Sequence, residues 1–300
     1  MILRERACGD GTIGILAAAS ELRSVAHSGL AFVHRCNHNP FPMPSRRSTP
    51  RFPASQEHRA VSPRAVLITG ASGGIGRAIS LAFGKAGWFV GIQYRRNKAG
   101  AEATLRRIAR TSGSGTLYEA DVRTAQSVQQ MVDAFCREAG VPSAFVCNAG
   151  IGHSSLVIKQ RVDDWADVIA TNLTGTYHCL RAMAPPLLAQ GGGSIIVIGS
   201  HAGFHGSVGQ AAYAASKAGL IGLVKTAAQE WGTHNVRVNL LLPGWQKTGL
   251  SEGAMPDADG WNDHSLRRPP SLDEVAQTLV HLVQLKDVSG QVWNCDSRNL

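Results

Sequence analysis

From Ala65 onward the chain alternates short apolar runs with longer amphipathic stretches. The apolar runs predict β-strands, which we place near residues 65–69, 88–93, 115–119, 143–147, 194–199, 235–240 and 291–295. Strands that alternate with helices are typical of βαβ units, whose right-handed crossovers put helices on both faces of a parallel sheet. The pattern therefore predicts an α/β fold in which residues 63–300 form one doubly wound domain around a seven-stranded parallel sheet.

Residues 1–62 lack this alternation. They contain eight Arg and no Lys, are rich in Pro from Pro40 onward, and show no sustained helical or strand period, so we expect a disordered extension. It could be an organellar transit peptide, a secretory signal, or a segment upstream of a later start at Met43. A secretory signal is least favoured because Glu5 and Asp10 interrupt its charged region, and the lack of an amphipathic Arg-bearing helix favours an inert extension. We expect a cytoplasmic protein, or an organellar one if this segment is a transit peptide.

The composition excludes several classes of protein. The chain has 300 residues, 44% of them hydrophobic, yet no apolar run approaches the roughly 20 residues of a membrane-spanning helix. Eight Arg against four acidic side chains in residues 1–62 account for +4 of the formal charge of +9, and the rest is diffuse. We therefore expect neither a membrane nor a nucleic acid as partner. Six Cys without a CxxC pair favour reduced, structural thiols.

A glycine-rich turn, TGASGGIG at residues 69–76, follows the first predicted strand. Gly70, Gly74 and Gly76 let the chain turn sharply before a helix whose amino end can hold a pyrophosphate, and Ser72 and Ile75 lie in the same turn. Glycine clusters are often ordinary loops, but the place directly after the first strand favours a dinucleotide site.

The second predicted strand ends in Tyr94, Arg95, Arg96 and Asn97, about 20 residues beyond the turn. An acidic residue there would bind a ribose 2′-hydroxyl, and none is present. Two arginines can instead pair with a 2′-phosphate, which favours NADP(H) over NAD(H), although NAD(H) and a solvated basic loop both stay open.

Other cofactor contacts are expected where later strands end. Asp121 and Val122 would meet the adenine, the 148–150 turn would give close backbone approach, and the segment after the sixth strand would enclose the nicotinamide carboxamide. A helix cap, a turn and a loop breaker are the ordinary alternatives for these segments. The expected contacts in the 148–150 turn are Asn148, Ala149 and Gly150, and those after the sixth strand are Pro243, Gly244 and Thr248.

Tyr213 and Lys217 are four residues apart, so a helix puts both on one face. Hydride delivery to a ketone builds negative charge on its oxygen, and a phenol beside an ammonium group can protonate that oxygen. We expect Lys217 to lower the pKa of Tyr213, and Ser200, at the end of the fifth strand, to hydrogen-bond the carbonyl. Asn172 lies in a predicted long helix although asparagine is a poor helix former; it could hold a water between Lys217 and solvent, or simply be exposed.

His201 and His205 have a spacing that suits metal ligands on a helix, but they lie in a predicted loop without a third ligand nearby. We therefore expect no metal. Trp245 could pack in the core or form a wall of the substrate pocket.

Together these motifs resemble the short-chain dehydrogenase/reductase family, in particular its 3-oxoacyl-[acyl-carrier-protein] reductase-like branch, over residues 65–296. The resemblance implies a Rossmann fold and a catalytic tetrad of Asn172, Ser200, Tyr213 and Lys217. In that family the tyrosine is the acid/base, and the tyrosine and lysine also contact the cofactor. It also implies a homo-oligomer, a tetramer or dimer, joined through helices near residues 163–188 and 210–232.

The chain departs from the family pattern in three places. Cys147 replaces the asparagine usual before Asn148. The stretch between Thr248 and Pro269, where relatives have a substrate lid, is compact and contains Asp257, Asp259, Asp263 and His264, and the tail after Asp296 lacks the usual two glycines. The substrate cannot be inferred from these segments.

The sequence thus predicts an NADPH-dependent reductase that converts a ketone, such as a 3-oxoacyl thioester, to a secondary alcohol. An NAD-dependent alcohol or sugar dehydrogenase, and a nucleotide-binding scaffold or redox sensor without turnover, are the alternatives. The complete tetrad speaks against the scaffold.

Overall fold

The computed structural model describes residues 64–249, 251 and 261–300. In this part of the chain seven strands form one all-parallel sheet in the order β3-β2-β1-β4-β5-β6-β7. The predicted α/β fold with a doubly wound parallel sheet is confirmed, and each strand end lies within two residues of its predicted place. The strands are β1 Ala65–Ile68, β2 Phe89–Tyr94, β3 Ser114–Glu119, β4 Ala144–Cys147, β5 Gly193–Ile198, β6 Val236–Leu242 and β7 Val292–Asn294.

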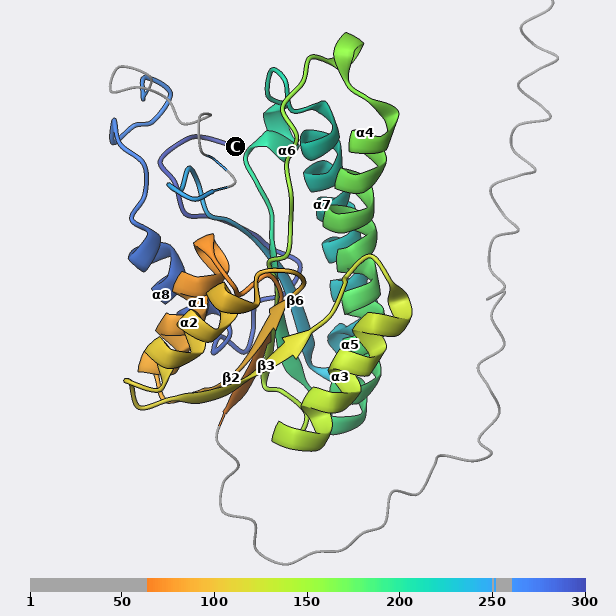
Figure 1. Ribbon diagram of the computed structural model, residues 1–300, viewed down its shortest axis with the longest axis vertical. Coiled ribbons are helices and arrows are strands. Elements are labelled where there is room, and N and C mark those ends of the chain that lie inside the picture. The colour runs from red at the N-terminus through yellow and green to blue at the C-terminus, as the bar shows by residue number, and fades with distance from the viewer. Residues whose placement is uncertain (1–63, 250, 252–260) are drawn as a thin grey trace, which may run out of the picture. The chain divides into compact units, whose positions relative to one another are not determined.

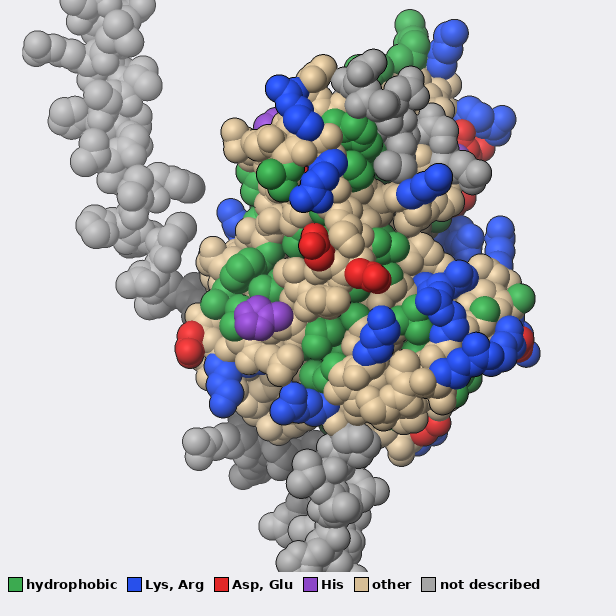
Figure 2. Space-filling view, turned by 90° about the vertical axis from the view of Figure 1, so that its left-hand side faces the viewer, with side chains coloured by type: hydrophobic (Ala, Val, Ile, Leu, Met, Phe, Trp, Pro, Cys, Tyr) green, Lys and Arg blue, Asp and Glu red, His purple; other side chains and the backbone are tan. Residues whose placement is uncertain are grey.

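Helices cover both faces of the sheet (Figure 1). One face carries α1 Gly74–Lys85, α2 Lys98–Ile108 and α8 Leu272–Leu282, the side seen in Figure 2. The other carries α3 Ala125–Ala139, α5 Gly175–Gln190 and α7 Ala211–Trp231, with α4 Val162–Ile169 leading through a π turn, η2 Ala170–Thr174, into α5. Shorter elements are η1 Val157–Lys159, α6 Ala202–His205 and η3 Gly232–His234. None of the described helices is long and apolar enough to cross a membrane.

Alternation along the strands divides the core into two layers. In β1, Val66 and Ile68 pack toward α1 and α8, whereas Ala65 and Leu67 pack toward α3 and α5. This is the period of two expected of a strand, with both faces apolar because helices cover both. Nearly every position of β1, β4 and β5 is buried, which explains why continuous apolar runs identified these strands.

The strand order reverses between β1 and β4, which is where a doubly wound sheet opens a crevice at its carboxyl edge. Asn148, directly after β4, spans this crevice: its side-chain amide donates to the carbonyl oxygens of Thr69 at 3.0 Å and Gly70 at 3.1 Å. The loops after β1 and β4 are therefore fixed to each other at the switch point. The prediction for residues 1–62 and the expectations for Asp257 and Asp259 lie outside the described residues.

Candidate active site

The glycine-rich turn needs its glycines because of close backbone approach. A Cβ on Gly76 would lie 2.2 Å from the carbonyl oxygen of Gly70, and one on Gly70 would lie 2.8 Å from the Cα of Ala149. Gly70 and Gly74 also adopt positive φ, of 65° and 53°. The turn leads into the amino end of α1, where unpaired backbone N–H groups and the helix dipole favour a phosphate.

Gln93, in the neighbouring strand β2, supports this turn. No sequence motif indicated it. Its Oε1 accepts from the backbone N–H of Gly70 at 2.7 Å and its Nε2 donates to the carbonyl of Ala120 at 2.7 Å. It therefore joins the loops that follow β1 and β3. A buried polar side chain in an otherwise apolar strand is the signal that could have found it.

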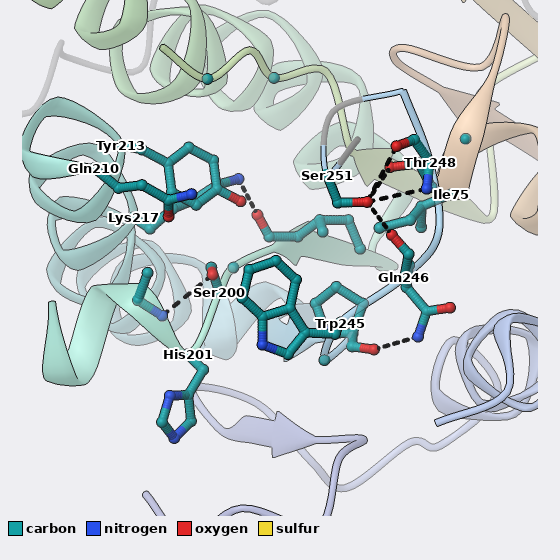
Figure 3. A pocket seen from close by; sticks show the side chains of 18 of the residues that line it. Ile75, Ser200, His201, Gln210, Tyr213, Lys217, Trp245, Gln246, Thr248 and Ser251 are labelled. Carbon is teal, nitrogen blue, oxygen red and sulfur yellow. Dashed lines mark hydrogen bonds between the residues drawn. The ribbon is translucent and has the colours of Figure 1, made fainter. Parts of the chain in front are cut away.

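A cavity of about 510 Å³ lies above the carboxyl ends of the strands. Most of the predicted site residues meet there (Figure 3). Those in its wall are Gly70, Ser72, Gly74, Ile75, Asn148, Gly150, Ser200, Tyr213, Lys217, Pro243, Gly244 and Thr248. Gly76, Arg95, Arg96, Asp121, Val122, Ala149 and Asn172 are not in its wall.

Ser200, Tyr213 and Lys217 come together from β5 and α7. Ser200 follows the end of β5 and lies within hydrogen-bonding reach of the Tyr213 hydroxyl. The Nζ of Lys217 lies 5.6 Å from the centroid of the Tyr213 ring and donates to the carbonyl of Ile198 at 2.7 Å. Burial lowers the pKa of Lys217 from 10.5 to about 8. A phenol, a hydroxyl and a buried ammonium group thus share one wall of the cavity.

The expected lowering of the Tyr213 pKa by Lys217 is not seen. Burial raises the pKa of Tyr213, and the hydrogen bond with Ser200 acts in the opposite direction. The physical reason is that the phenol is removed from water while the ammonium group of Lys217 is directed at the Ile198 carbonyl.

Asn172 is fully buried in the π turn η2. Its Oδ1 accepts from the N–H of Ile151 at 2.9 Å, and its Nδ2 donates to the carbonyl of Ile151 at 2.9 Å and to the hydroxyl of Ser216 at 3.1 Å. The exposed alternative is therefore wrong. The side chain connects the loop after β4 with α7, and its role in holding a water stays a prediction.

Asp121, which we expect to contact the adenine, belongs to an ion-pair cluster outside the cavity wall. Asp121 is paired with Arg123 at 2.7 Å and lies 3.8 Å from Arg95. The hydrogen bonds from Arg123 hold the pKa of Asp121 below its usual value. Arg123, which no sequence motif indicated, also pairs with Asp167 at 3.1 Å. The side chain of Arg96 is exposed.

Other residues that were not predicted as site residues also line the cavity, among them His153, His201, Gln210 and Arg298. Trp245 is in the cavity wall as well, which decides between the two predictions made for it, core packing and a pocket wall (Figure 3). The described wall contains no Asp or Glu. The loops that carry the lining residues are brought together by tertiary contacts, such as the hydrogen bond from the backbone N–H of Ser155 to the carbonyl of Gly209 at 2.8 Å.

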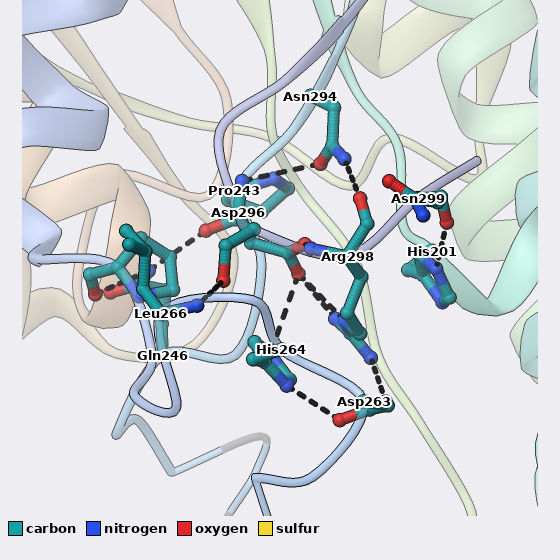
Figure 4. A network of polar contacts seen from close by, with 12 residues as sticks. His201, Pro243, Gln246, Asp263, His264, Leu266, Asn294, Asp296, Arg298 and Asn299 are labelled. Atoms are coloured by element: carbon teal, nitrogen blue, oxygen red, sulfur yellow. Dashed lines mark hydrogen bonds and ion pairs between the residues drawn. The ribbon is translucent and has the colours of Figure 1, made fainter.

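The carboxyl-terminal tail contributes Arg298 to the cavity wall. Figure 4 shows the polar contacts that hold this tail. Arg298 pairs with the buried carboxylate of Asp296, while His201 is 3.0 Å from the carbonyl of Asn299 through its Nε2. Burial tends to raise the pKa of Asp296, but the hydrogen bonds from Arg298 outweigh it and leave that pKa lowered. His264 lies beside the same carboxylate, with its Nε2 3.9 Å from Asp296. The unusual tail is thus part of the site.

The described histidines and cysteines lie in separate environments. His201 and His205 stack with their ring centroids 4.3 Å apart, and no group of three or more His, Cys, Asp or Glu within the described ranges could hold a metal. Cys147 is buried at the end of β4. Burial is the main cause that raises the pKa of its thiol, and a hydrogen bond with Cys179 adds to this effect. The described cysteines are free, as expected of reduced thiols.

The tight glycine turn, the amino end of α1 and the cavity beside it fit a dinucleotide in an extended conformation. Comparison with known proteins agrees. The profile of the short chain dehydrogenase family matches residues 64–259. A 3-oxoacyl-[acyl-carrier-protein] reductase of Synechocystis sp. is 37% identical over 240 residues, covering 79% of this chain and 97% of the relative.

Two further proteins show the same relationship. A 3-oxoacyl-[acyl-carrier-protein] reductase of Staphylococcus epidermidis is 33% identical over 235 residues, covering 76% of this chain and 95% of the relative. Among solved structures, a Sinorhizobium meliloti 1021 protein described as a short-chain alcohol dehydrogenase superposes with a TM-score of 0.74 at 28% identity, covering 79% of this chain and 96% of the other. This chain therefore belongs to the short-chain dehydrogenase family of NAD(P)-dependent oxidoreductases that act on CH–OH groups.

Proposed function

We propose that the protein reduces a ketone to a secondary alcohol with NADPH, and that its substrate is a 3-oxoacyl thioester. The observation that carries this proposal is the convergence of Ser200, Tyr213 and Lys217 on one cavity beside the glycine-rich turn. The thioester is supported by the 3-oxoacyl-[acyl-carrier-protein] reductases among its relatives, at 33% and 37% identity.

The chain's own residues have distinct roles in this proposal. Ser200 hydrogen-bonds the substrate carbonyl, and Tyr213, whose raised pKa keeps it protonated at neutral pH, donates its proton to the developing oxyanion. Lys217 stays mainly protonated below its pKa of about 8 and stabilises the tyrosinate that remains. Asn172 holds the π turn against α7 and would position a water that returns a proton to Lys217. The bound nicotinamide supplies the hydride.

The preference for NADPH rests on Arg95, Arg96 and Ser72. The second strand ends without an acid that would bind a 2′-hydroxyl, and the exposed guanidinium of Arg96 is available to a 2′-phosphate. The adenine would lie by Asp121 and Val122, the pyrophosphate over Gly74 to Gly76, and the nicotinamide beside Gly150, Pro243, Gly244 and Thr248. Tyr213 and Lys217 would contact its ribose.

The proposed assembly is a homo-oligomer through α4, α5 and α7. Large apolar side chains are exposed on α4 and α5, with Val162 82%, Trp165 41% and Tyr177 47% exposed. A second copy of the chain would cover such side chains.

We also propose that the protein is located in the cytoplasm.

The test is NADPH and NADH oxidation by the full chain, measured in parallel with acetoacetyl-CoA and with simple ketones and sugars. We expect NADPH consumption with the thioester and loss of at least about a thousandfold in kcat for Tyr213→Phe, with NADPH binding nearly unchanged. NADH-linked turnover of alcohols or sugars alone would contradict the proposal and favour the alternative dehydrogenase. Tight NADPH binding without any turnover would favour the scaffold.

A further inference from the structure

A second concavity lies on the outer face of α1 and α8; it shares Gly74 and Thr248 with the first cavity but is not lined by Ser200, Tyr213 or Lys217. It has a volume of about 680 Å³ and is lined by residues of α1 and Ala86 directly after it, and by α8 from Leu272 to Val280, with Arg107, Lys247 and Thr248 at its borders. At 1.5 Å per residue, the lining stretch of α1 is roughly 18 Å long. We call this feature the α1/α8 groove; it is on the side of the molecule seen in Figure 2.

The floor of the groove is apolar. Ala78, Leu81 and Ala82 from α1 face Ala276 and Val280 from α8. On each helix these residues recur every three or four positions, which places them in one stripe along the helix. All but Ala276 keep part of their surface exposed although they pack on the core below. The floor is therefore a continuous apolar strip that the described residues do not cover.

Basic side chains stand at both ends of this strip. Arg77 and Lys247 lie at the Gly74 end, where Thr248 packs against Gly74, and Lys85 and Arg107 occupy the last turns of α1 and α2. Among the described residues lining the groove only Asp273 is acidic. No described carboxylate lies within 4.0 Å of any of the four basic groups.

We propose that the α1/α8 groove binds an acidic amphipathic helix of a partner protein. Three turns of helix match the length of the groove, an apolar face matches its floor, and carboxylates flanking that face match the cations at its two ends. A compact polyanion would reach the cations of one end only and would leave the apolar strip empty. The formal charge of +5 on residues 63–300 further favours encounter with an acidic partner.

The probe is a fluorescent synthetic peptide of 14 residues with Leu along one helical face and Glu on the other, titrated with the full chain and followed by anisotropy. We expect saturable binding that Lys85→Glu combined with Arg107→Glu weakens by about tenfold or more, because both cations of one end are reversed. The matched control, Arg137→Glu combined with Lys225→Glu, makes the same charge change on α3 and α7 and is expected to alter binding by less than about twofold. Replacing Leu by Ser in the peptide should abolish binding.

Several results would overturn this inference. They are no binding of the Leu/Glu peptide, equal weakening by the groove and control variants, or binding that survives the Leu to Ser exchange. A change of sedimentation of the groove variant would assign the groove to a second copy of the chain. Binding to phosphatidylserine vesicles that only the groove variant loses would assign it to a membrane surface. NADPH-linked turnover is independent of Lys85 and Arg107, so it reports separately on the proposed function.

Discussion

Asn172 and Ser216 are joined by a buried hydrogen bond of 3.1 Å that connects the π turn with the helix carrying Tyr213 and Lys217. The same carboxamide also binds both backbone groups of Ile151. The local distortion of the helix at η2 is what aims Asn172 at these partners, since a π turn rotates side chains relative to a regular helix. Asn172 therefore fixes α7 to the loop that follows β4.

We expect Asn172→Ala to lower the free energy of unfolding by about 2–4 kcal/mol, because three side-chain hydrogen bonds are lost and Ile151 is left with unpaired polar groups. Urea unfolding measures this change. Ser216→Ala removes only one of these bonds from Asn172 and should cost about 1 kcal/mol. Equal losses in the two variants would show that Asn172 does not hold the loop after β4.

The glycine-rich turn gives a second prediction. In Gly76→Ala the added Cβ would lie 2.2 Å from the Gly70 carbonyl, so the backbone must move, and we expect at least about a tenfold loss of NADPH affinity with lowered stability. Gly232→Ala is the control, because Gly232 has helical φ and nothing within 4 Å of the added atom. It should be neutral or raise the free energy of unfolding by up to about 1 kcal/mol. Unchanged NADPH affinity in Gly76→Ala would contradict the close-approach argument.

The fold could be predicted from the sequence because its strands are buried on both faces. Parallel strands such as β1 and β5 are continuous apolar runs, which few other elements share at that length. The pairing of Tyr213 with Lys217 could also be predicted, because a single helix brings residues at this spacing together without tertiary information, and both side chains line the cavity.

Residues whose role depends on distant contacts were missed. Arg298 reaches the cavity only because the tail folds back over the segment after β5, and Gln93 supports the turn after β1 from a neighbouring strand. Local spacing carries no signal for Arg298, and for Gln93 the one local signal is a polar residue within an apolar strand. The pKa of Tyr213 was wrongly anticipated for the same reason, since the direction is decided by the burial of its hydroxyl in the folded protein.

Cofactor preference provides a third prediction. Arg96→Ala should raise the KM for NADPH by about tenfold to a hundredfold and leave the KM for NADH nearly unchanged, because only NADPH carries a 2′-phosphate. Parallel steady-state kinetics with the two cofactors measure the ratio. Arg123→Ala is a useful contrast: it removes the partner that holds Asp121 at 2.7 Å and should weaken both cofactors alike. A similar rise for NADPH and NADH in Arg96→Ala would exclude a 2′-phosphate contact.

The buried Lys217 makes stability depend on pH in the alkaline range. Its pKa falls from 10.5 to about 8 on burial, so between these values the unfolded chain binds more protons than the folded one, and stability rises with pH. Below pH 8 the lysine is charged in both states and the cost of burying that charge is fully present. Relative to Lys217→Met, the wild type should gain up to about 3 kcal/mol between pH 8 and 10.5. Tyr213 ionises in both proteins, so its effect cancels in the difference. The free energy of unfolding of both proteins is measured as a function of pH. A difference between them that stays constant from pH 8 to 10.5 would show that Lys217 is not buried as a charge.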